Sequence, residues 1–335
     1  MFFKGAKVLI IGGTGTIGEN LIKQILLEEP EVIRVLSRDE YKQYLLQNQL
    51  DKQKNLRYLI GDVRDFDRVF SAMNDIDFVF HLAAMKHVPA CEYNPYEAVL
   101  TNIHGTQNVI KAAIAQKVKK VIFTSSDKAI SPTNIYGATK LAAERLISAA
   151  EYSKGKGITI LTSVRFGNVI GSRGSVIPYF INQIVEERKV TVTDQFMTRF
   201  MMTVNDATQL TIQALKEAKG GEIFVLKMPV ILLKDLVSVV IEETCKKYCI
   251  DVENIKIEDI GLRPGEKRHE ELMTYEESMD GWELENMYIL APGFGKLHNY
   301  NGAEKAKAGT YSSHNQKPLS LEEVRTLLKK EILLL

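Results

Sequence analysis

The sequence predicts an α/β fold, with a doubly wound parallel sheet and a smaller C-terminal lobe. Two observations predict this fold. Short runs of β-branched and other apolar residues alternate with longer stretches in which apolar residues recur at the helical period. A glycine-rich segment at residues 12–18 follows the first run directly, as happens where a strand of such a sheet turns into a helix. The 335 residues, 45% of them hydrophobic, suffice for a large core and a second lobe.

Seven segments carry the strand pattern. We expect helices between the first five, because the intervening stretches are long enough and have the helical period. The last two segments would extend the same sheet. In chain order, the predicted strands lie at residues 7–11, 32–36, 56–60, 78–81, 121–124, 159–165 and 222–226.

The later part of the chain lacks a clean alternation and predicts the second lobe. We expect residues 1–166, joined by parts of 204–228, to form the sheet domain, and residues 167–203 and 229–335 to form the lobe and a tail. The tail contains a segment rich in Gly, Ser, Asn and Lys at 299–318 and an amphipathic helix around 319–334. It is either an ordered cover or a loose arm. Ligands of open α/β sheets bind beyond the carboxyl ends of the strands, where we expect the lobe.

Composition excludes several classes of function. The 43 basic and 42 acidic residues nearly cancel and form no long run, so we expect no nucleic-acid partner and no membrane surface. Three cysteines at irregular positions fit free thiols in a reducing compartment. The apolar run at 8–11 is too short for a secretory signal, and no stretch approaches the roughly 20 apolar residues of a membrane span. The sequence therefore predicts a cytoplasmic protein.

The glycine-rich segment after the first strand predicts a dinucleotide site. Its Gly-xx-Gly-xx-Gly spacing permits a tight turn, close approach of the backbone to a pyrophosphate, and a helix N-terminus directed at the anion. The strand before it and the helix after it make a simple glycine turn the weaker interpretation. The expected contacts to the dinucleotide come from Gly12, Thr14, Gly15, Thr16, Ile17 and Gly18.

The end of the second strand predicts which dinucleotide binds. Ser37 and Arg38 come first and Lys42 follows one helical turn later, so cations are placed to meet the 2′-phosphate of NADP. The alternative is a solvated helix start that Asp39 or Glu40 caps.

Further cofactor contacts are expected at the ends of the third and fourth strands. Asp62 is placed to accept a hydrogen bond from the adenine amine, although it could equally cap a helix. Small residues after the fourth strand would let the nicotinamide approach. The expected contacts are Asp62, Val63, Ala83, Ala84, Lys86 and Asn102, while His87 could be structural.

The segment after the fifth strand carries the candidate reactive groups. Tyr136 and Lys140 lie four residues apart on a predicted helix, so they share one face, and the ammonium can lower the pKa of the phenol while it binds the nicotinamide ribose. This pair alone supports hydride chemistry. Asp127 and Lys128, next to Ser126, add the acid and the base that an elimination requires, unless they form only a surface ion pair.

These motifs resemble the extended short-chain dehydrogenase/reductase superfamily, whose fold is Rossmann-like. The finer resemblance is to the UDP-N-acetylglucosamine 4,6-dehydratases, in particular the 5-inverting kind that opens the pseudaminic acid pathway. Ser126 stands where that family usually has Thr, which keeps the hydroxyl. The resemblance covers about residues 5–292, and the matching blocks are 37–40, 86–89, 126–129, 136–140, 167–175, 197–200 and 263–267.

The resemblance implies a reaction in which tightly bound NADP is regenerated in each turnover. Tyr136 would take the 4-hydroxyl proton while a hydride leaves C4, and Ser126 would hydrogen-bond the same oxygen. Lys128, if held neutral by desolvation or by nearby Lys140, would abstract the C5 proton, and Asp127, if protonated, would protonate the leaving 6-hydroxyl. The division of acid and base between Asp127 and Lys128 can be drawn either way.

The resemblance also implies residues that hold a UDP-sugar. Arginine forks suit phosphate oxygens, and a carboxylate can accept from a ribose hydroxyl, although Glu266 could instead form a salt bridge. The predicted substrate contacts are Lys86, Asn168, Arg173, Val176, Arg199, Arg263 and Glu266. A homo-oligomer is implied through helices at about 95–117 and 136–152. We predict no metal, because Cys245 and Cys249 lack further ligands and His81 fits a core position.

Two other functions remain open. A UDP-sugar 4-epimerase needs Tyr136 and Lys140 but has no use for Asp127 and Lys128. A non-catalytic NADP-binding regulator would need only the dinucleotide site. Mass measurement of the product formed from UDP-N-acetylglucosamine distinguishes loss of water, an isomer of equal mass, and no turnover.

Overall fold

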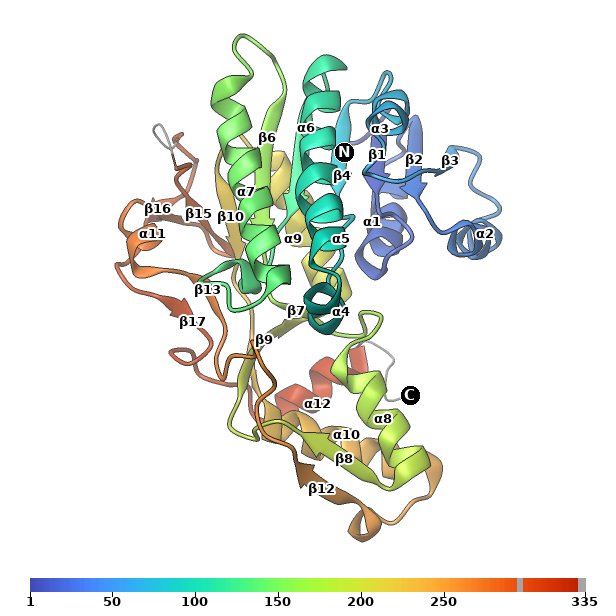
Figure 1. Cartoon of the computed structure of the whole chain (residues 1–335), viewed down its shortest axis with the longest axis vertical. Coiled ribbons are helices and arrows are strands. Elements are labelled where there is room, and N and C mark those ends of the chain that lie inside the picture. The colour runs from blue at the N-terminus through green and yellow to red at the C-terminus, as the bar shows by residue number, and fades with distance from the viewer. Residues whose placement is uncertain (294–297, 331–335) are drawn as a thin grey trace.

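A parallel sheet forms the centre of the protein, as the sequence predicts (Figure 1). The computed structural model describes residues 1–293 and 298–330. Each predicted strand is present with ends within one residue of the prediction. Across the parallel part of the sheet the strands are β3 (Leu56–Ile60), β2 (Val32–Ser37), β1 (Lys7–Ile11), β4 (Phe78–His81), β5 (Lys120–Thr124), β6 (Ile160–Arg165) and β10 (Ile223–Leu226).

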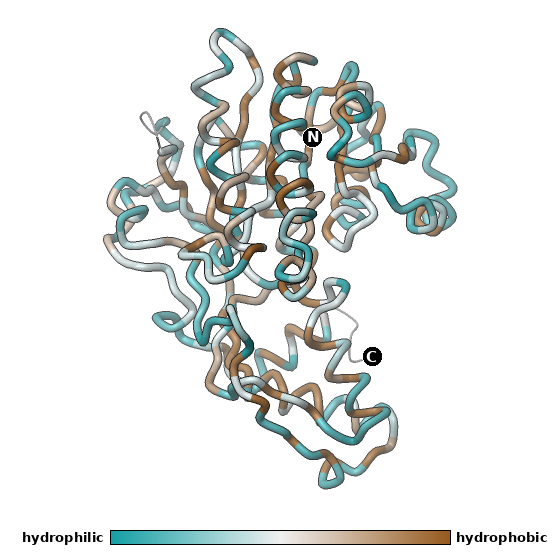
Figure 2. The backbone as a smooth tube through the Cα atoms, in the orientation of Figure 1, coloured by the Kyte–Doolittle hydropathy of each residue, from teal (hydrophilic) through white to brown (hydrophobic). Residues whose placement is uncertain are grey.

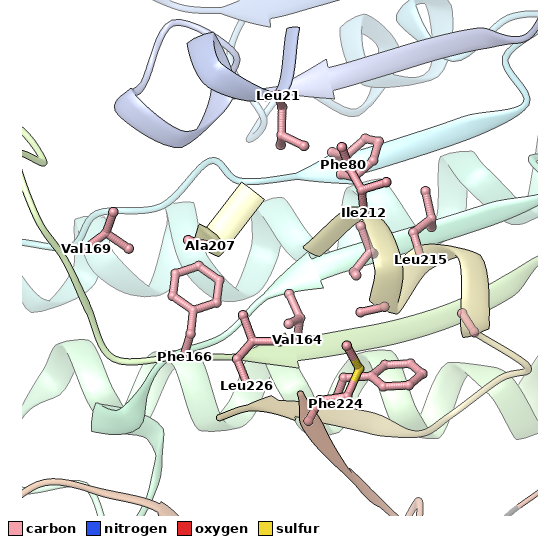
Figure 3. Packing of buried hydrophobic residues seen from close by; sticks show 14 of the residues in the cluster. Leu21, Phe80, Val164, Phe166, Val169, Ala207, Ile212, Leu215, Phe224 and Leu226 are labelled. Atoms are coloured by element: carbon pink, nitrogen blue, oxygen red, sulfur yellow. The ribbon is translucent and has the colours of Figure 1, made fainter. Parts of the chain in front are cut away.

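Helices cover both faces of this sheet, which confirms the doubly wound α/β prediction. One face carries α1 (Thr16–Leu26), α2 (Glu40–Gln49) and α9 (Val204–Glu217). Figure 3 shows Phe80, Val164 and Phe224 of the strands packed against Leu21 of α1 and Ile212 and Leu215 of α9. The other face carries α3 (Phe66–Ala72), α6 (Gly105–Ala115) and α7 (Ile135–Ser153).

Polar residues fix where several helices begin. Asp39 caps α2 by accepting from the Lys42 backbone N–H at 3.0 Å, so the capping role considered for Asp39 is confirmed. Asn134 caps α7 in the same way, accepting from the Gly137 N–H at 2.9 Å. Before α6 the chain runs through α4 (Val88–Tyr93), α5 (Pro95–Ala98) and the π-helical turn η1 (Val99–His104).

The lobe lies beyond the carboxyl ends of the strands and has a core of its own (Figure 1). Its helices α8 (Val176–Glu187), α10 (Leu233–Tyr248) and α12 (Leu321–Lys330) pack buried Ile and Val side chains together. The predicted last helix extends to 334, but residues 331–335 lie outside the described part of the chain. The strands of the lobe are β7 (Asn168–Val169), β9 (Thr198–Met202) and β11 (Val230–Leu232), and β8 (Lys189–Val192) with β12 (Lys256–Asp259); η3 (Val252–Asn254) precedes β12.

Part of the segment that we assigned to the lobe instead extends the large sheet. The strand β15 (Met287–Leu290) pairs antiparallel with β10, and β14 (Trp282–Glu283) and β16 (Glu304–Lys305) follow it. These strands are too short to show a period in the sequence. Near them, β13 (Glu271–Met273) pairs with β17 (Tyr311–Ser312), and α11 (Tyr275–Met279) lies between.

The tail at 299–318 is an ordered cover rather than a loose arm. Tyr300 and Tyr311 are each only 6% exposed, and the Tyr311 hydroxyl contacts the backbone N–H and C=O of Met228 at 2.8 and 3.2 Å. Figure 2 shows hydrophobic residues in the sheet and along the helices that cover it, whereas the residues of α2 at the sheet edge are mostly hydrophilic. Within residues 1–293 and 298–330, no helix is long and apolar enough to cross a membrane.

A buried ionic cluster anchors the segment that leads into α11. Arg165, at the end of β6, is fully buried and bonds Glu144 of α7 at 2.6 Å and Glu277 of α11 at 2.9 Å. Its guanidinium also donates to the Leu272 carbonyl at 2.8 Å. A buried charge is stable only when it is paired and hydrogen-bonded in this way. The cluster therefore holds residues 272–277 at a fixed position against the sheet.

Candidate active site

The first cavity, of about 620 Å³, lies over the glycine loop between β1 and α1. Loop residues predicted to contact the dinucleotide all line it. So do most of the contacts predicted on the neighbouring strand ends. The predicted residues that line this cavity are Gly12, Thr14, Gly15, Thr16, Ile17, Gly18, Ser37, Arg38, Lys42, Val63, Ala83, Ala84 and Lys86.

The loop fits a dinucleotide because its glycines leave room for close backbone approach. Gly12 has φ +84°, and a Cβ there would lie 2.8 Å from the backbone nitrogen of Ala83, so only glycine fits. Gly15 caps α1 without any side-chain bond to the first turn. The N–H groups of that turn are therefore available to an anion in the cavity.

The end of β2 presents cations at the rim of the first cavity. The Lys42 ammonium is 2.7 Å from Asp39, whereas the Arg38 side chain is 58% exposed and lies 3.5 Å from Asp62. Asp62 also pairs with Arg64 at 2.8 Å. Burial tends to raise the pKa of the Asp62 carboxyl, but Arg64 and Arg38 outweigh it and the pKa is lowered. Asp65, not Asp62, caps α3, so that alternative for Asp62 is wrong.

Asn102 holds the loop after β4, which lines part of the first cavity. Its side chain is 1% exposed, accepts from Met85 N–H at 2.8 Å, and donates to the Met85 carbonyl and to Thr139 at 3.0 and 2.9 Å. The predicted cofactor contact therefore holds the loop after β4 and does not line the cavity. His81 is a fully buried core residue that bonds Thr106 at 3.0 Å.

The second cavity, of about 490 Å³, adjoins the first and gathers the candidate reactive groups. They come from the turn η2 (Asp127–Ala129), directly after β5, and from the first turns of α7. All five predicted catalytic residues line this cavity: Ser126, Asp127, Lys128, Tyr136 and Lys140.

Gly137 lets α7 approach the η2 turn closely enough to bring these groups together. A Cβ at Gly137 would lie only 2.0 Å from the Lys128 carbonyl oxygen. Any other residue at 137 must push the helix away from the turn. The glycine after Tyr136 is thus part of the geometry of the site.

Hydrogen bonds join Ser126, Asp127 and Lys128. The Ser126 hydroxyl donates to Asp127 Oδ1 at 2.7 Å, and it is close enough to the Tyr136 phenol to lower the phenol pKa. The Lys128 ammonium donates to both Asp127 oxygens at 3.0 Å and to Asn168 Oδ1 at 3.4 Å. The Ser126 hydroxyl therefore lies between the phenol and the carboxyl.

The electrostatics of Tyr136 and Lys140 differ from the expectation. Burial lowers the pKa of Lys140 to about 7, against a smaller opposing effect of Glu144, and its ammonium donates to the Thr124 carbonyl. Burial raises the pKa of Tyr136, and the hydrogen bond of Ser126 and the charge of Lys128 oppose that rise. Lys140, which we expected to lower the phenol pKa, is not among the main causes of this shift; the cation that lowers the pKa of Tyr136 is Lys128.

Lys128 is an ammonium in this arrangement, which corrects the expectation of a neutral amine. Burial tends to lower its pKa, but the negative charges of Asp127 and Glu270 outweigh burial and raise it. Lys140 is not among the main causes of this shift. For Lys128 to act as a base, one of the two neighbouring carboxylates must first take a proton from it.

The predicted substrate contacts separate into three groups. Lys86, Asn168, Val176, Arg199 and Glu266 line the second cavity. Arg173 instead lies over the glycine loop, where its guanidinium donates to the Thr14 carbonyl at 2.7 Å and pairs with Glu19.

Arg263 lines only a third cavity, of about 630 Å³, between α4 and the loop at 263–267. This third cavity meets the second at Lys128, Asn168, Arg199 and Glu266. The Arg199 guanidinium donates to the carbonyls of Thr198, Lys267 and Arg268 at 2.8 to 3.0 Å and lies 3.5 Å from Glu266. The salt bridge considered for Glu266 is therefore present.

Comparison with known proteins identifies relatives along most of the chain. The model of a family described as polysaccharide biosynthesis protein matches residues 8–292. An inverting UDP-N-acetylglucosamine 4,6-dehydratase of Campylobacter jejuni is 41% identical, with 97% of each chain covered. A UDP-glucose 4-epimerase of Rickettsia rickettsii is 40% identical over 97% of this chain and 96% of its own. A Methanocaldococcus jannaschii protein described as an uncharacterized membrane protein is 47% identical over 98% and 97%.

Solved structures agree with the fold. The X-ray structure of Pen from Bacillus thuringiensis is 64% identical, covers 99% of both chains and superposes with a TM-score of 0.94. The dTDP-glucose 4,6-dehydratase DesIV of Streptomyces venezuelae, solved with NAD and TYD bound, has a TM-score of 0.69 at 20% identity, over 78% of this chain and 86% of its own. The DesIV likeness concerns the fold alone.

Proposed function

This chain belongs to the polysaccharide biosynthesis protein family, and on that premise we propose that it is a nucleotide-sugar dehydratase, a lyase that removes water from UDP-N-acetylglucosamine. The observation that carries the proposal is the position of the Asp127–Lys128 pair. It lies in the same cavity as Tyr136 and Lys140, the pair that serves hydride chemistry. An acid and a base beside a redox pair are what elimination next to a transient ketone requires.

The first cavity would hold a nicotinamide dinucleotide, with the pyrophosphate over the glycine loop and the N-terminus of α1. When bound, this group would supply a transient oxidation at C4 and the return of the same hydride to C6. Tyr136 would remove the 4-hydroxyl proton, and the 4-ketone would make the C5–H acidic. Lys140 would hold the ribose next to Tyr136.

Lys128 and Asp127 would then carry out the elimination. Lys128, once neutral, would take the C5 proton, and Asp127 would protonate the leaving 6-hydroxyl. The position of Ser126, which bonds Asp127 and lies close to Tyr136, supports one source for the proton that Asp127 donates. Tyr136 would give its own proton to Ser126 as it takes the proton of the 4-hydroxyl, and Ser126 would pass one proton on to the Asp127 carboxyl.

We expect deuterium at C4 of UDP-N-acetylglucosamine to reappear on the C6 methyl of a product that has lost one water. The reason is that the same hydride would be removed from C4 and returned to C6 within one site, without exchange with solvent. Mass spectrometry measures the loss of water, and NMR of the product locates the deuterium. Loss of water without deuterium at C6 would contradict the internal hydride return.

The same experiment decides between the proposed dehydratase and its alternatives. The 4-epimerase is favoured by the Rickettsia rickettsii relative, and it would give a product of unchanged mass. A non-catalytic NADP-binding regulator would give no product. The Asp127–Lys128 ion pair has no task in either alternative, which is why we favour dehydration.

We propose NADP as the dinucleotide and inversion at C5 as the outcome, which would place the protein in the pseudaminic acid pathway. The exposed Arg38 guanidinium at the rim of the first cavity supports NADP, because a guanidinium suits the 2′-phosphate. The inverting dehydratase of Campylobacter jejuni supports inversion.

Replacing Arg38 tests the NADP proposal. Arg38→Ala is expected to weaken NADP binding roughly 10- to 100-fold, because it removes a charge-assisted hydrogen bond to the 2′-phosphate. Binding of NAD to the same variant is the internal control and should change little. Titration calorimetry with both dinucleotides measures the two affinities. An equal loss for both would assign Arg38 a structural role.

We further propose that the protein works in the cytoplasm as a homo-oligomer. Free thiols at Cys91, Cys245 and Cys249 fit a reducing compartment. The helices α6 and α7 lie side by side on one face of the sheet and offer a surface for a second copy (Figure 1). Light scattering of the purified protein measures the assembly.

A further inference from the structure

Glu270 is a buried carboxyl group beside Lys128 to which the proposed reaction gives no task. It is 4% exposed, and its Oε1 lies 3.4 Å from the Lys128 ammonium. Within the described residues, its Oε2 is buried and has no hydrogen-bond partner. Lys128 therefore lies between two carboxyl groups, Asp127 on one side and Glu270 on the other.

The backbone of Glu270 is fixed from both directions by the tail. Its N–H donates to the Ser313 hydroxyl at 2.9 Å, and the Ser313 N–H donates to its carbonyl at 2.8 Å. Four charged groups face its side chain: Asp127 and Lys128 of η2, Arg199 of β9, and Lys267 of the preceding loop. The Arg199 Nε lies 3.9 Å from Oε1. The carboxyl thus has a fixed position in the third cavity.

The surroundings of Glu270 favour its protonated form. A buried carboxylate oxygen without a hydrogen bond is costly, whereas a neutral carboxyl avoids most of that cost. Burial raises the pKa of Glu270; Asp127 adds to the rise, while Lys128, Arg199 and Lys267 reduce it. Asp127 differs, because its oxygens accept bonds from Ser126 and Lys128. Of the two carboxyl groups, Glu270 is the better place for an additional proton.

We propose that Glu270 is the positioning residue that makes Lys128 a base, by accepting one proton from its ammonium when sugar displaces water from the second cavity. One N–H bond of Lys128 breaks and one O–H bond of Glu270 forms, and no electrons are transferred. This inference rests on the proposed dehydratase function, because only elimination requires a neutral Lys128.

The proton balance closes with both carboxyl groups in separate roles. Asp127 receives the 4-hydroxyl proton through Tyr136 and Ser126, and loses it to the departing 6-hydroxyl as water forms. Lys128 takes the C5 proton, and the Lys128–Glu270 pair then holds two protons, one of which returns to C5. After the product leaves, Glu270 gives its proton back to Lys128. No group ends the cycle with a proton more or less than at its start.

The test is Glu270→Gln, which keeps the size of the side chain but cannot accept the proton. At neutral pH we expect C4 oxidation to stay near the wild-type rate. The transient near-ultraviolet absorbance of reduced nicotinamide measures this step. Exchange of the C5 hydrogen with deuterated water should fall at least about tenfold. The exchange should recover as pH rises, because bulk base can then remove the Lys128 proton. Glu271→Gln, the same change one residue along, is the matched control and should behave like wild type.

A second measurement does not depend on turnover. In Tyr136→Phe protein, where oxidation is blocked, infrared difference spectra on adding UDP-N-acetylglucosamine should show the C=O stretch of a protonated buried carboxyl. When Glu270→Gln is combined with Tyr136→Phe, this band should be lost. When Glu271→Gln is combined with Tyr136→Phe instead, the band should remain.

Two results would overturn the role of Glu270. One is wild-type C5 exchange in Glu270→Gln at neutral pH, which would mean that Asp127 alone neutralises Lys128. The other is an equal loss of oxidation and exchange without recovery at high pH, which would mean a structural role. Failure of the wild-type protein to release water is a different result and would refute the dehydratase function itself.

Discussion

Lys128→Ala is expected to reduce dehydration of UDP-N-acetylglucosamine by about 1,000-fold, the scale of a lost general base. The C5–H is acidic only next to the 4-ketone, and Lys128 is the amine that lies in the second cavity between Asp127 and Glu270. C4 oxidation should persist at a lower rate, because Tyr136 and Lys140 remain while the Lys128 charge that opposes the rise of the Tyr136 pKa is lost. Single-turnover measurement of water loss and of reduced nicotinamide separates the two steps.

The control for Lys128→Ala is Tyr136→Phe, which should lose both steps because no group then takes the 4-hydroxyl proton. Removal of Lys128 also leaves two buried carboxyl groups without their shared cation, so the melting temperature and dinucleotide binding must be measured alongside. Full dehydration by a folded Lys128→Ala protein would refute the assigned base.

Gly137→Ala is expected to have the second-largest effect, a loss of activity of about 100-fold. The substitution removes no reactive group, and the loss comes from displacement of α7 relative to the η2 turn. The added Cβ would lie 2.0 Å from the Lys128 carbonyl oxygen, so α7 and the η2 turn must separate. Tyr136 then moves relative to Ser126 and Asp127. Steady-state kinetics measures the loss, and thermal unfolding measures the accompanying overpacking, which typically costs about 1–3 kcal/mol.

Ala138→Gly is the matched control for this prediction. Ala138 is the next residue of α7 and its side chain is exposed, so the change costs about 1 kcal/mol of helix stability without moving the turn. Its activity should remain close to wild type. If Gly137→Ala retained full activity as well, the close approach of helix and turn would not matter for catalysis.

Most strands were predictable because the inner ones, β1, β4, β5, β6 and β10, are buried on both faces and therefore read as short apolar runs. The β-branched segment at 121–124, for example, differs from β5 only by Lys120 at its start. The short antiparallel strands of the sheet edge were not predictable. Two residues of β14 or β16 carry no period, and Tyr300 and Tyr311 alone did not indicate that the polar tail at 299–318 would fold back onto the sheet.

The reactive groups were predictable because they lie close together in the sequence, within residues 126–140, directly after one strand. Residues that contribute from elsewhere were harder. Asn102 was identified as functional, but its role as a support for the loop after β4 depends on bonds across the fold. Glu270 was missed, although it follows the block at 263–267 by three residues. Its burial depends on contacts across the fold, with Lys128, with Arg199 and with Ser313 of the tail.

The distance in sequence between Glu270 and its clamp, Ser313, has a consequence for how the protein matures during synthesis. The strands from β1 to β10 are complete once residue 226 has emerged, so a nascent chain can form the glycine-loop cavity early. The bonds between Ser313 and Glu270 form only after residue 313 has left the ribosome, 87 residues later than the end of β10. A chain arrested before that point would be able to take up a dinucleotide, yet it would lack the ordered carboxyl next to Lys128.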